Sequence, residues 1–361
     1  MTSLYRDLDA IVVGGGCAGL FTTINLLQRG LKCLLLAPQD DAFSQTRLCQ
    51  GIIHSGIKYK FYSKDEFGND VLSQACHSWE RYLDGQEINL SKVKLLSNDC
   101  ILWSSNIWDY FFTRNIVKNV LKARITKLNN KAVNTQLRKV GAVFSVNEKI
   151  IDTSSLLQEL TQHIGDNKLE YSTPPKLNLS ADGSISSLSL NTGRRTIELQ
   201  AKSIIFCAGN GNQDYHKALS KKEIRYQNRP LTMVTVTGDL PLINGHLIGK
   251  GGVLATITTT GDEEERHWQI GGKVAETSGE LYDHEIRAFI QDHFRDIDIH
   301  ALKIGFKKIE RSEGFYNGNR LPDNYIIEQE KNAFFCWPTK LVLSPVMAKD
   351  ICHRIAQEAY S

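Results

Sequence analysis

Residues 1–36 constrain the fold of this chain more than any other stretch. Residues 11–13 are Ile-Val-Val, an apolar β-branched run that is typical of a buried parallel strand. Three glycines follow in the spacing G-x-G-x-x-G, at Gly14, Gly16 and Gly19. A helix pattern then ends at Gly30, and residues 31–36 return as a second apolar run. This order of strand, glycine turn, helix and strand predicts a βαβ unit that binds a dinucleotide.

Each glycine has its own task in such a turn. The first allows the tight turn, the second lets a pyrophosphate approach the backbone, and the third lets helix and strand pack closely. The free N–H groups at the helix start can hold the pyrophosphate without a basic side chain. The acidic residue expected about 20 residues further on, which would bind the ribose, is replaced by Ala37. Either Gln39 or Asp40 reaches the ribose instead, with weaker binding of the adenosine half, or the nucleotide is not the usual one.

Length and charge limit the class of protein. A chain of 361 residues suits two interleaved domains that enclose a site. Its 43 basic and 40 acidic residues give a formal net charge of +3, and no long basic block occurs. We therefore expect a small-molecule substrate and no nucleic acid partner.

The cysteines and the N-terminus indicate the cell compartment. Eight cysteines are scattered without a C-x-x-C pair or a metal-like cluster, which predicts buried reduced thiols, no metal site and a cytoplasmic location. Asp7 and Asp9 precede the first apolar run, so no signal peptide is expected. No stretch of 18 apolar residues occurs, so we expect no transmembrane segment, whereas peripheral membrane contact stays open.

A second glycine-flanked segment gives more specific information. It reads Gly51-Ile52-Ile53-His54-Ser55-Gly56-Ile57-Lys58-Tyr59. Its glycines let the backbone approach a flat ligand while one imidazole points at that ligand. The segment resembles the flavin-facing loop of the D-amino-acid-oxidase-like (DAO) family of FAD-dependent oxidoreductases. It is most similar to the branch of L-2-hydroxyglutarate dehydrogenases and oxidases.

Three further segments carry the same resemblance. Residues 152–160 resemble the family's helix that leads back to the nucleotide domain, and residues 203–207 form an apolar strand that ends in Ala208-Gly209. Near the end of the chain, Trp337-Pro338-Thr339-Lys340 stands where the family has a loop under the flavin. This last segment is nearer the form of the glycerol-3-phosphate dehydrogenase branch.

The resemblance implies an α/β fold with two interleaved parts. The first is a Rossmann-like FAD-binding domain of the GR2/DAO type, expected from residues 1–75, 150–215 and 320–361. The second is an antiparallel-sheet substrate or cap domain, expected from residues 76–149 and 216–319. Alternating apolar patterns between residues 229 and 309 support this sheet.

The resemblance also implies FAD as the cofactor and a set of residues that bind it. These residues are Gly14, Gly16, Cys17, Ala18, Gly19, Arg47, Gly51, Ile52, Ile53, Lys176, Ala208, Gly209, Trp337, Pro338, Thr339, Lys340 and Leu341. Only one complete dinucleotide fingerprint is present, and none follows for NAD. We therefore expect a small substrate to reduce the flavin, and oxygen, a quinone or another carrier to reoxidise it.

Three residues are candidates for the chemistry itself. His54 is the candidate base, because an imidazole titrates near neutral pH and can take the hydroxyl proton of a 2-hydroxy acid. Lys340 is expected beside the flavin, where its charge stabilises the reduced ring. A substrate carboxylate needs a fixed cation, for which Arg320 is preferred and Arg311 is the alternative.

These residues predict an FAD-dependent oxidoreductase, a dehydrogenase or oxidase, that oxidises a small CH–OH substrate by hydride transfer to flavin N5. The predicted substrate is a 2-hydroxy acid. An amine or amino-acid oxidase of the same fold is the first alternative, and it requires no histidine base. A nucleotide-binding protein without turnover is the second, because of Ala37.

Overall fold

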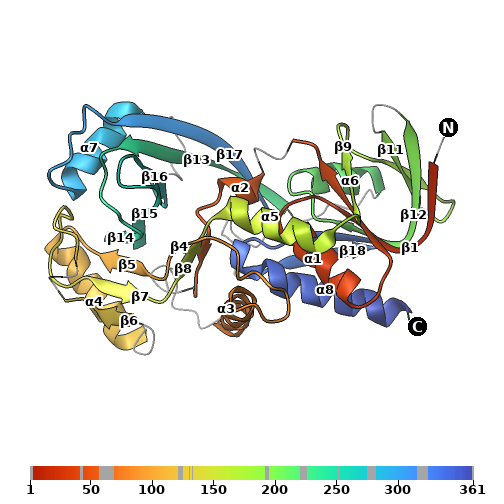
Figure 1. The fold of residues 1–361 in the computed structure, drawn as a ribbon, viewed down its shortest axis with the longest axis horizontal. Helices are drawn as coiled ribbons and strands as arrows, with labels where there is room; N and C mark the ends of the chain where they lie inside the picture. The colour runs from red at the N-terminus through yellow and green to blue at the C-terminus, as the bar shows by residue number, and fades with distance from the viewer. Residues whose placement is uncertain are drawn as a thin grey trace.

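The computed structural model describes residues 3–40, 44–56, 69–120, 125–129, 131, 133–191, 195–219, 226–249, 252–274, 282–314 and 324–359. The strands of these residues form two large sheets and one small sheet. Figure 1 shows the two large sheets at opposite ends of the long axis, connected by the extended strands β13 (Tyr226–Gly238) and β17 (Lys303–Gly314).

The first large sheet contains the predicted dinucleotide-binding unit. Its main order is β10-β11-β12-β1-β2-β9, and β19 adds to β12 and β18 to β19. The strands are β1 (Ser3–Val13), β2 (Cys33–Pro38), β9 (Lys168–Tyr171), β10 (Lys176–Leu179), β11 (Ile185–Asn191), β12 (Thr196–Phe206), β18 (Ile326–Glu330) and β19 (Ala333–Trp337). β1 pairs in parallel with both β2 and β12. The apolar runs near residues 11, 34 and 204 therefore lie side by side, as the sequence predicts.

Helices cover both faces of this sheet, which explains why β1 is apolar on both sides. Ala10 and Val12 pack with α1 (Cys17–Gln28), α5 (Thr153–Ile164) and α8 (Ser344–Ala359), which Figure 1 shows together on one side. Ile11 and Val13 pack on the other face, toward α6 (Gly211–Leu219). A strand buried on both faces is a continuous apolar run instead of an alternating pattern.

The central helix α1 is buried although it carries polar residues. The side chains of Thr22, Thr23 and Asn25 each donate a hydrogen bond of 2.8 Å to the carbonyl four residues earlier. Because these groups are satisfied within the helix, they can be buried without the cost of an unpaired polar group.

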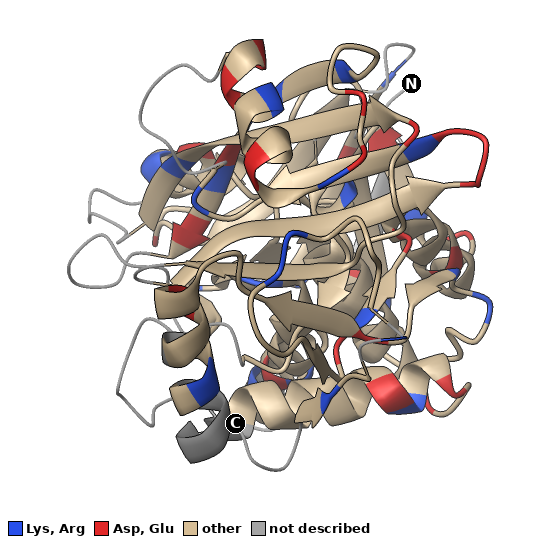
Figure 2. Cartoon of the chain, turned by 90° about the vertical axis from the view of Figure 1, so that its left-hand side faces the viewer, with Lys and Arg blue, Asp and Glu red and all other residues tan. Residues whose placement is uncertain are grey.

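The second large sheet has the order β17-β13-β16-β15-β14-β5-β7-β6 and is antiparallel except for the pair β14–β5. The remaining strands are β5 (Cys100–Trp103), β6 (Ile125–Lys127), β7 (Phe144–Val146), β14 (Gly245–Gly249), β15 (Gly252–Gly261) and β16 (Arg266–Gly271). α7 (Asp283–His293) packs on it through Ile286 and Ile290, and α4 (Ile107–Val120) lies near β14. The alternating sequence pattern thus predicts the correct sheet type here. On the end of the molecule that faces the viewer in Figure 2, acidic and basic residues are interspersed.

A small sheet lies between the two large ones. It contains β3 (Ile52–Ile53), β8 (Lys149–Ile151) and β4 (Leu95–Ser97), in the order β3-β8-β4. α3 (Asn69–Leu83) packs through Trp79 and Tyr82 against Phe21 of α1. The boundary predicted at residue 75 therefore falls inside a helix that shares its core with α1.

Candidate cofactor and active site

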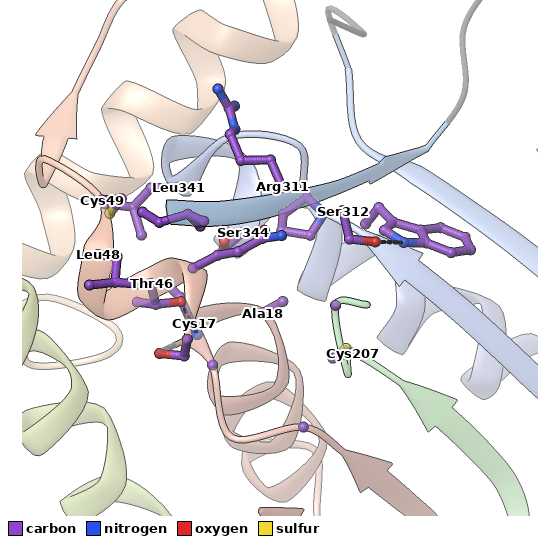
Figure 3. Close-up of a pocket in the computed structure, with 18 of the residues that line it drawn as sticks. Cys17, Ala18, Thr46, Leu48, Cys49, Cys207, Arg311, Ser312, Leu341 and Ser344 are labelled. Carbon is purple, nitrogen blue, oxygen red and sulfur yellow. Dashed lines mark hydrogen bonds between the residues drawn. The ribbon is translucent and has the colours of Figure 1, made fainter. Parts of the chain in front are cut away.

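A cavity of about 450 Å³ lies where the first sheet meets β13 and β17. One wall contains the glycine turn after β1 and the end of β12. The opposite wall contains the segment before β3, the residues after β19 and the end of β17. Figure 3 shows these segments around the cavity, with Cys17 and Ala18 on one side and Arg311 and Ser312 on another. Ligands of open α/β sheets bind at the carboxyl ends of the strands, where this cavity is found.

The glycine turn has the geometry that its sequence predicts. Gly14 has φ +123°, and a Cβ atom there would lie 2.3 Å from the carbonyl oxygen of Cys207. A Cβ atom at Gly19 would lie 1.9 Å from the carbonyl oxygen of Gly14. At Gly16, by contrast, a Cβ atom would meet only Thr46 Oγ1, at 3.2 Å. Gly14 and Gly19 therefore hold the turn together, whereas Gly16 leaves the backbone open toward the cavity.

The start of α1 provides an electrostatic field for an anionic ligand. Gly16 is the N-cap and contributes no side-chain cap, and the first turn carries no acidic residue. The N–H of Cys17 donates to Thr46 Oγ1 at 3.1 Å, which ties the turn to the short helix α2 (Gln45–Leu48). The other N–H groups and the helix dipole favour negative charge at this end of the cavity. This cradle fits a dinucleotide pyrophosphate.

The missing ribose-binding acid has a structural explanation. Ala37 is 3% exposed, and its Cβ lies 2.8 Å from where a Cβ of Gly15 would stand. A small residue suits this crowded contact between β2 and the glycine turn, and Ala37 does not line the cavity. Gln39 and Asp40 do not line it either, but Pro38 and Tyr171 do.

The segment with the candidate base is fixed at both ends. Ile52 and Ile53 pair with β8, and a Cβ atom at Gly51 would lie 2.0 Å from the carbonyl oxygen of Ile151. On the far side, Ser55 donates its N–H to Glu148 Oε1 at 2.8 Å and its hydroxyl at 3.1 Å. His54 stands between these two anchors, is 6% exposed and lines the cavity.

Glu148 belongs to a buried polar network beneath this segment. Its other oxygen lies 3.4 Å from His246 Nε2, and His246 Nδ1 lies 2.9 Å from Thr256 Oγ1. In the part of the chain that the structure describes, potential metal-ligand atoms of Cys100, Glu148 and His246 lie within 4.8 Å of one another. The hydrogen bonds to Ser55 give this network a role in positioning the segment that carries His54.

The segment after β19 forms the cavity wall from the other end of the chain. Thr339 adopts φ +58° and donates its hydroxyl to the carbonyl of Asn324 at 3.0 Å. Lys340 is 5% exposed and lines the cavity, together with Ser344 at the start of α8. The sequence segments around His54 and Lys340 therefore meet at one cavity, although the two residues are 286 positions apart in the numbering.

Most of the predicted cofactor-binding residues line this cavity, and four do not. Gly19 packs inside the turn, Ile53 packs in the core beneath β3, and Arg47 is exposed on α2. Lys176 lines a second cavity of about 540 Å³, which adjoins the first because Tyr171 and Ala208 line both. Arg320 lies outside the described residues, as do Lys58 and Tyr59.

Several residues that line the cavity are not among those predicted from the sequence. They are Ser44, Gln45, Thr46, Leu48, Cys49 and Gln50 around α2, and Leu231, Met233, Ile309, Glu310 and Ser312 on the two long strands. No local pattern identifies the strand residues, because only the pairing of β13 with β17 brings them to the cavity. Ser312 accepts a hydrogen bond of 3.2 Å from the indole of Trp337, which connects β17 to the predicted loop (Figure 3).

Burial raises the pKa of three cysteine thiols at the cavity. Burial raises the pKa of Cys17 and of Cys336 far above the usual range for a thiol. Burial also raises the pKa of Cys49, while the Gly51 backbone N–H and the charge of Arg311 act in the opposite direction. All eight cysteines are free, and six of them are buried, so the predicted buried reduced thiols are present.

Comparison with known proteins identifies the class that this fold and cavity define. The family model described as FAD dependent oxidoreductase (DAO) matches residues 9–352. The chain therefore belongs to the DAO family of FAD-dependent oxidoreductases, and it is an enzyme with FAD as its cofactor. The hypothesis of a nucleotide-binding protein without turnover is therefore wrong. None of the described helices is both long and apolar enough to span a bilayer.

Among individual proteins, the chain is similar to a probable FAD-dependent oxidoreductase of Pseudomonas aeruginosa, PA4991. The two are 26% identical over 363 residues, which cover 97% of this chain and 91% of the relative. The crystal structure of PA4991 superimposes with a TM-score of 0.81 at 25% identity, covering 99% and 92% of the two chains. The fold is also that of glycine oxidase from Geobacillus kaustophilus, with a TM-score of 0.70, 13% identity and coverage of 99% and 95%.

Proposed function

We propose that this enzyme oxidises a small CH–OH substrate, a 2-hydroxy acid, by hydride transfer to flavin N5. The observation that carries the proposal is the position of His54 in the cavity wall, where it is held from both sides and 6% exposed. An amine oxidase has no need for such a base, because a neutral amine can lose its hydride directly. The L-2-hydroxyglutarate branch is the proposed functional relative, on the strength of residues 51–56.

The proposed orientation of FAD rests on two parts of the cavity lining, the glycine turn and the segments around His54 and Lys340. The pyrophosphate binds at Gly14, Gly16, Cys17 and Ala18, because free backbone N–H groups and a helix dipole meet there. Ala208, Gly209 and Lys176 would hold the adenosine half, because the two cavities that they line adjoin. Residues of the segments 51–54 and 337–341 that line the cavity would hold the flavin. When bound, FAD supplies the hydride acceptor.

His54 is the proposed general base. Its imidazole would take the proton of the substrate hydroxyl, while the carbon that bears this hydroxyl gives up its hydride to the flavin and becomes a carbonyl carbon. The anchors at Gly51 and Ser55 restrict the movement of the ring, so that little ordering is needed when the substrate binds. A base of this kind contributes about 10²- to 10⁴-fold to the rate.

Lys340 is the proposed electrostatic partner. Lys340 lines the cavity and is 5% exposed as a residue, and a charge in such a buried position is screened only weakly by water. A fixed cation at this end of the cavity favours negative charge beside it, and this is worth more in a dry site than in water.

The proposal extends to domains and location. We propose that the first sheet, α1, α3, α5, α6 and α8 form the FAD-binding domain, and that the second large sheet with α4 and α7 forms the substrate domain. A reducing cytoplasm is the proposed location, and the free buried thiols support it. Arg320 stays a prediction for the substrate carboxylate.

Anaerobic reduction of the bound flavin tests the function. The FAD-loaded enzyme is mixed with 2-hydroxy acids, amino acids and glycerol phosphate, and the loss of flavin absorbance is followed in a stopped-flow instrument. We expect a 2-hydroxy acid to bleach the flavin, and His54→Ala to slow this step by about 10²- to 10⁴-fold.

The matched control is His77→Ala, because His77 is an exposed residue of α3 that contacts Glu80 of the same helix. We expect the substrate to reduce the flavin of this variant at the wild-type rate. If only amino acids bleach the flavin, and the flavin of His54→Ala is reduced as fast as that of the wild type, the amine oxidase is favoured. Glycine oxidase shares this fold.

A further inference from the structure

A cluster of three buried side chains lies outside the cofactor cavity, next to the segment that carries His54. Its members are Cys100, Glu148 and His246, which are 0%, 1% and 1% exposed. The sulfur, carboxylate and imidazole atoms that could bind a metal lie within 4.8 Å of one another. None of the three residues belongs to the described lining of the cavity. The cluster is therefore a separate site.

The neighbouring strands β14, β5 and β7 of the second large sheet carry this cluster (Figure 1). His246 of β14 pairs with Leu102 of β5, and Cys100 lies two residues before Leu102. Because side chains alternate along a strand, Cys100 and His246 point to the same face of the sheet. Glu148 comes from the turn between β7 and β8, where its N–H donates to the carbonyl of Val146 at 2.7 Å. Paired strands hold such atoms in place, so that little reorganisation is needed to bind a ligand.

The distance between Glu148 and His246 is long for a hydrogen bond. Glu148 Oε2 and His246 Nε2 lie 3.4 Å apart, whereas a hydrogen bond from N–H to oxygen usually spans about 2.7–3.2 Å. Two ligands of one tetrahedral zinc ion, each about 2.0–2.2 Å from the metal, lie about 3.3–3.5 Å from each other. The observed distance therefore matches two ligands of one zinc ion.

The remaining polar atoms of these two side chains have the partners that metal ligands usually have. His246 Nδ1 lies 2.9 Å from the hydroxyl of Thr256, its neighbour across the β14–β15 ladder. Glu148 Oε1 accepts the N–H and the hydroxyl of Ser55. Such contacts orient the ring and the carboxylate of a metal site, with Nε2 and Oε2 directed at the metal. In the tautomer whose Nδ1–H donates to Thr256, lone pairs face each other at Nε2 and Oε2, and a cation between them removes this repulsion.

The charges of the three side chains suit a divalent cation. A Cys100 thiolate and the Glu148 carboxylate together balance the charge of such an ion, and His246 binds as the neutral ring. A buried site without net charge avoids the high cost of an unpaired buried charge. Thiolate sulfur and imidazole nitrogen favour zinc, whereas magnesium and calcium prefer oxygen ligands.

We propose that Cys100, Glu148 and His246 bind one Zn²⁺ ion, with a water molecule as the fourth ligand. Binding releases the thiol proton of Cys100. The ion has a structural role, because Glu148 connects it to Ser55, the residue after His54. The sequence predicts no metal site, because the three ligands are 48 and 98 positions apart and form no spacing motif.

A hydrogen-bonded network without a metal is the alternative. In that network a protonated His246 donates to Glu148, and Cys100 is a buried thiol among the apolar residues of its strand. The two explanations differ in a measurable way, because only the metal site holds an ion in a fixed ratio to the chain.

Metal analysis of the FAD-loaded enzyme tests the proposal. The enzyme is produced in zinc-supplemented medium, and its zinc content is measured by mass spectrometry before and after treatment with a chelator. We expect one zinc ion per chain, a lower Tm after its removal, and recovery of the Tm when Zn²⁺ is added back. Exchange for Co²⁺ should add a thiolate-to-metal charge-transfer band and d–d bands at longer wavelengths than those of the flavin.

Three substitutions locate the ion. Cys100→Ala removes the thiolate, and Glu148→Gln removes the carboxylate charge while its amide oxygen can still accept from Ser55. We expect each of these variants to lose most of its zinc. Thr256→Val removes only the contact to the ring of His246, and it should weaken zinc binding by about 10- to 100-fold.

Cys352→Ala and Thr258→Val are the matched controls. Cys352 is a buried thiol of α8, and Thr258 is a buried threonine of β15, the strand that carries Thr256. Neither belongs to the cluster. We therefore expect both variants to have the zinc content of the wild type.

Two results would overturn the proposal. One is a wild-type enzyme that holds far less than one zinc ion per chain and takes up neither Zn²⁺ nor Co²⁺. The other is a full zinc content in both Cys100→Ala and Glu148→Gln. If neither variant folds, the Co²⁺ spectrum of the wild type decides, because a spectrum without thiolate charge transfer excludes Cys100 as a ligand. Zinc content is measured without substrate, so this proposal and the proposed function can fail independently.

Discussion

The glycine turn after β1 and the arginine pair, Arg229 of β13 and Arg311 of β17, depend on the sequence in different ways, although the turn and Arg311 line the same cavity. The turn consists of residues close together in the chain, and its glycines are required by the backbone itself. The arginine pair depends on a contact between residues 84 positions apart, from Arg229 to Glu313. A cofactor that many enzymes share can be recognised by a local motif, whereas a substrate is recognised by side chains that only the folded sheet brings together.

The largest expected effect concerns the turn. Gly19→Ala places a methyl group 1.9 Å from the carbonyl oxygen of Gly14, against backbone that cannot move aside. We expect the free energy of unfolding to fall by about 3 kcal/mol or more, in the range of overpacking, with loss of bound FAD. Urea unfolding and the flavin content of the purified protein measure both effects.

Gly30→Ala is the control for this variant. A Cβ atom at Gly30 meets nothing within 4 Å, so only its φ of +77° opposes the substitution. The cost should be about 1–2 kcal/mol, with FAD retained. An equal loss in both variants would mean that close packing of strand and helix does not explain Gly19.

The next effect concerns the two arginines that contact Glu313. Arg229→Met removes the two-point partner of buried Glu313, and we expect a loss of about 3 kcal/mol in the free energy of unfolding. Arg311→Met should cost less than half as much, because Arg229 still neutralises the carboxylate. Thermal and urea unfolding of the two variants compare the losses, and equal losses would contradict the larger share of Arg229 in neutralising Glu313.

A smaller effect is expected at the start of α5, just after the strand that pairs with β3. Asp152 Oδ1 accepts a hydrogen bond of 2.6 Å from the N–H of Ser155 and caps the helix. Asp152→Ala should lower the free energy of unfolding by about 1 kcal/mol. Asp166→Ala, an exposed residue beyond the same helix, is the control and should change stability by less than about 0.5 kcal/mol in a urea titration.

The smallest effect depends on pH. The hydrogen bond from Lys202 at 2.8 Å, with that from the Lys32 backbone, lowers the pKa of Asp9 in the folded protein. A carboxyl whose pKa is lower when folded stabilises the fold above its unfolded pKa, and this contribution is lost as the pH falls through the folded pKa. Lys202 is largely exposed, so Lys202→Met should lower the free energy of unfolding only slightly at pH 7. The difference from the wild type should vanish in acid, and a difference that persists at pH 2 would contradict this explanation.

The sequence predicts the arrangement of the nucleotide half well. The apolar runs around Ile11, Leu34 and Ile204 become adjacent parallel strands, and residues 337–341 reach the same cavity as the glycine turn. The prediction of individual contacts is less complete. Lys176 lines a neighbouring cavity, and Arg47 is exposed on α2. Successive side chains of a strand point to opposite faces, so Ile52 lines the cavity whereas Ile53 packs in the core.

The sequence by itself determined the glycine turn, because only glycine can adopt φ +123° at residue 14 beside Cys207 and leave residue 19 in contact with Gly14. It also determined that this turn is followed by a helix whose start attracts an anion. Tertiary structure alone decided what faces that anion site. Glu148 binds Ser55, and Glu313 binds two arginines, so both carboxylates contact residues far away in the chain. A buried carboxylate is stable only with such donors, and folding alone brings the donors to it.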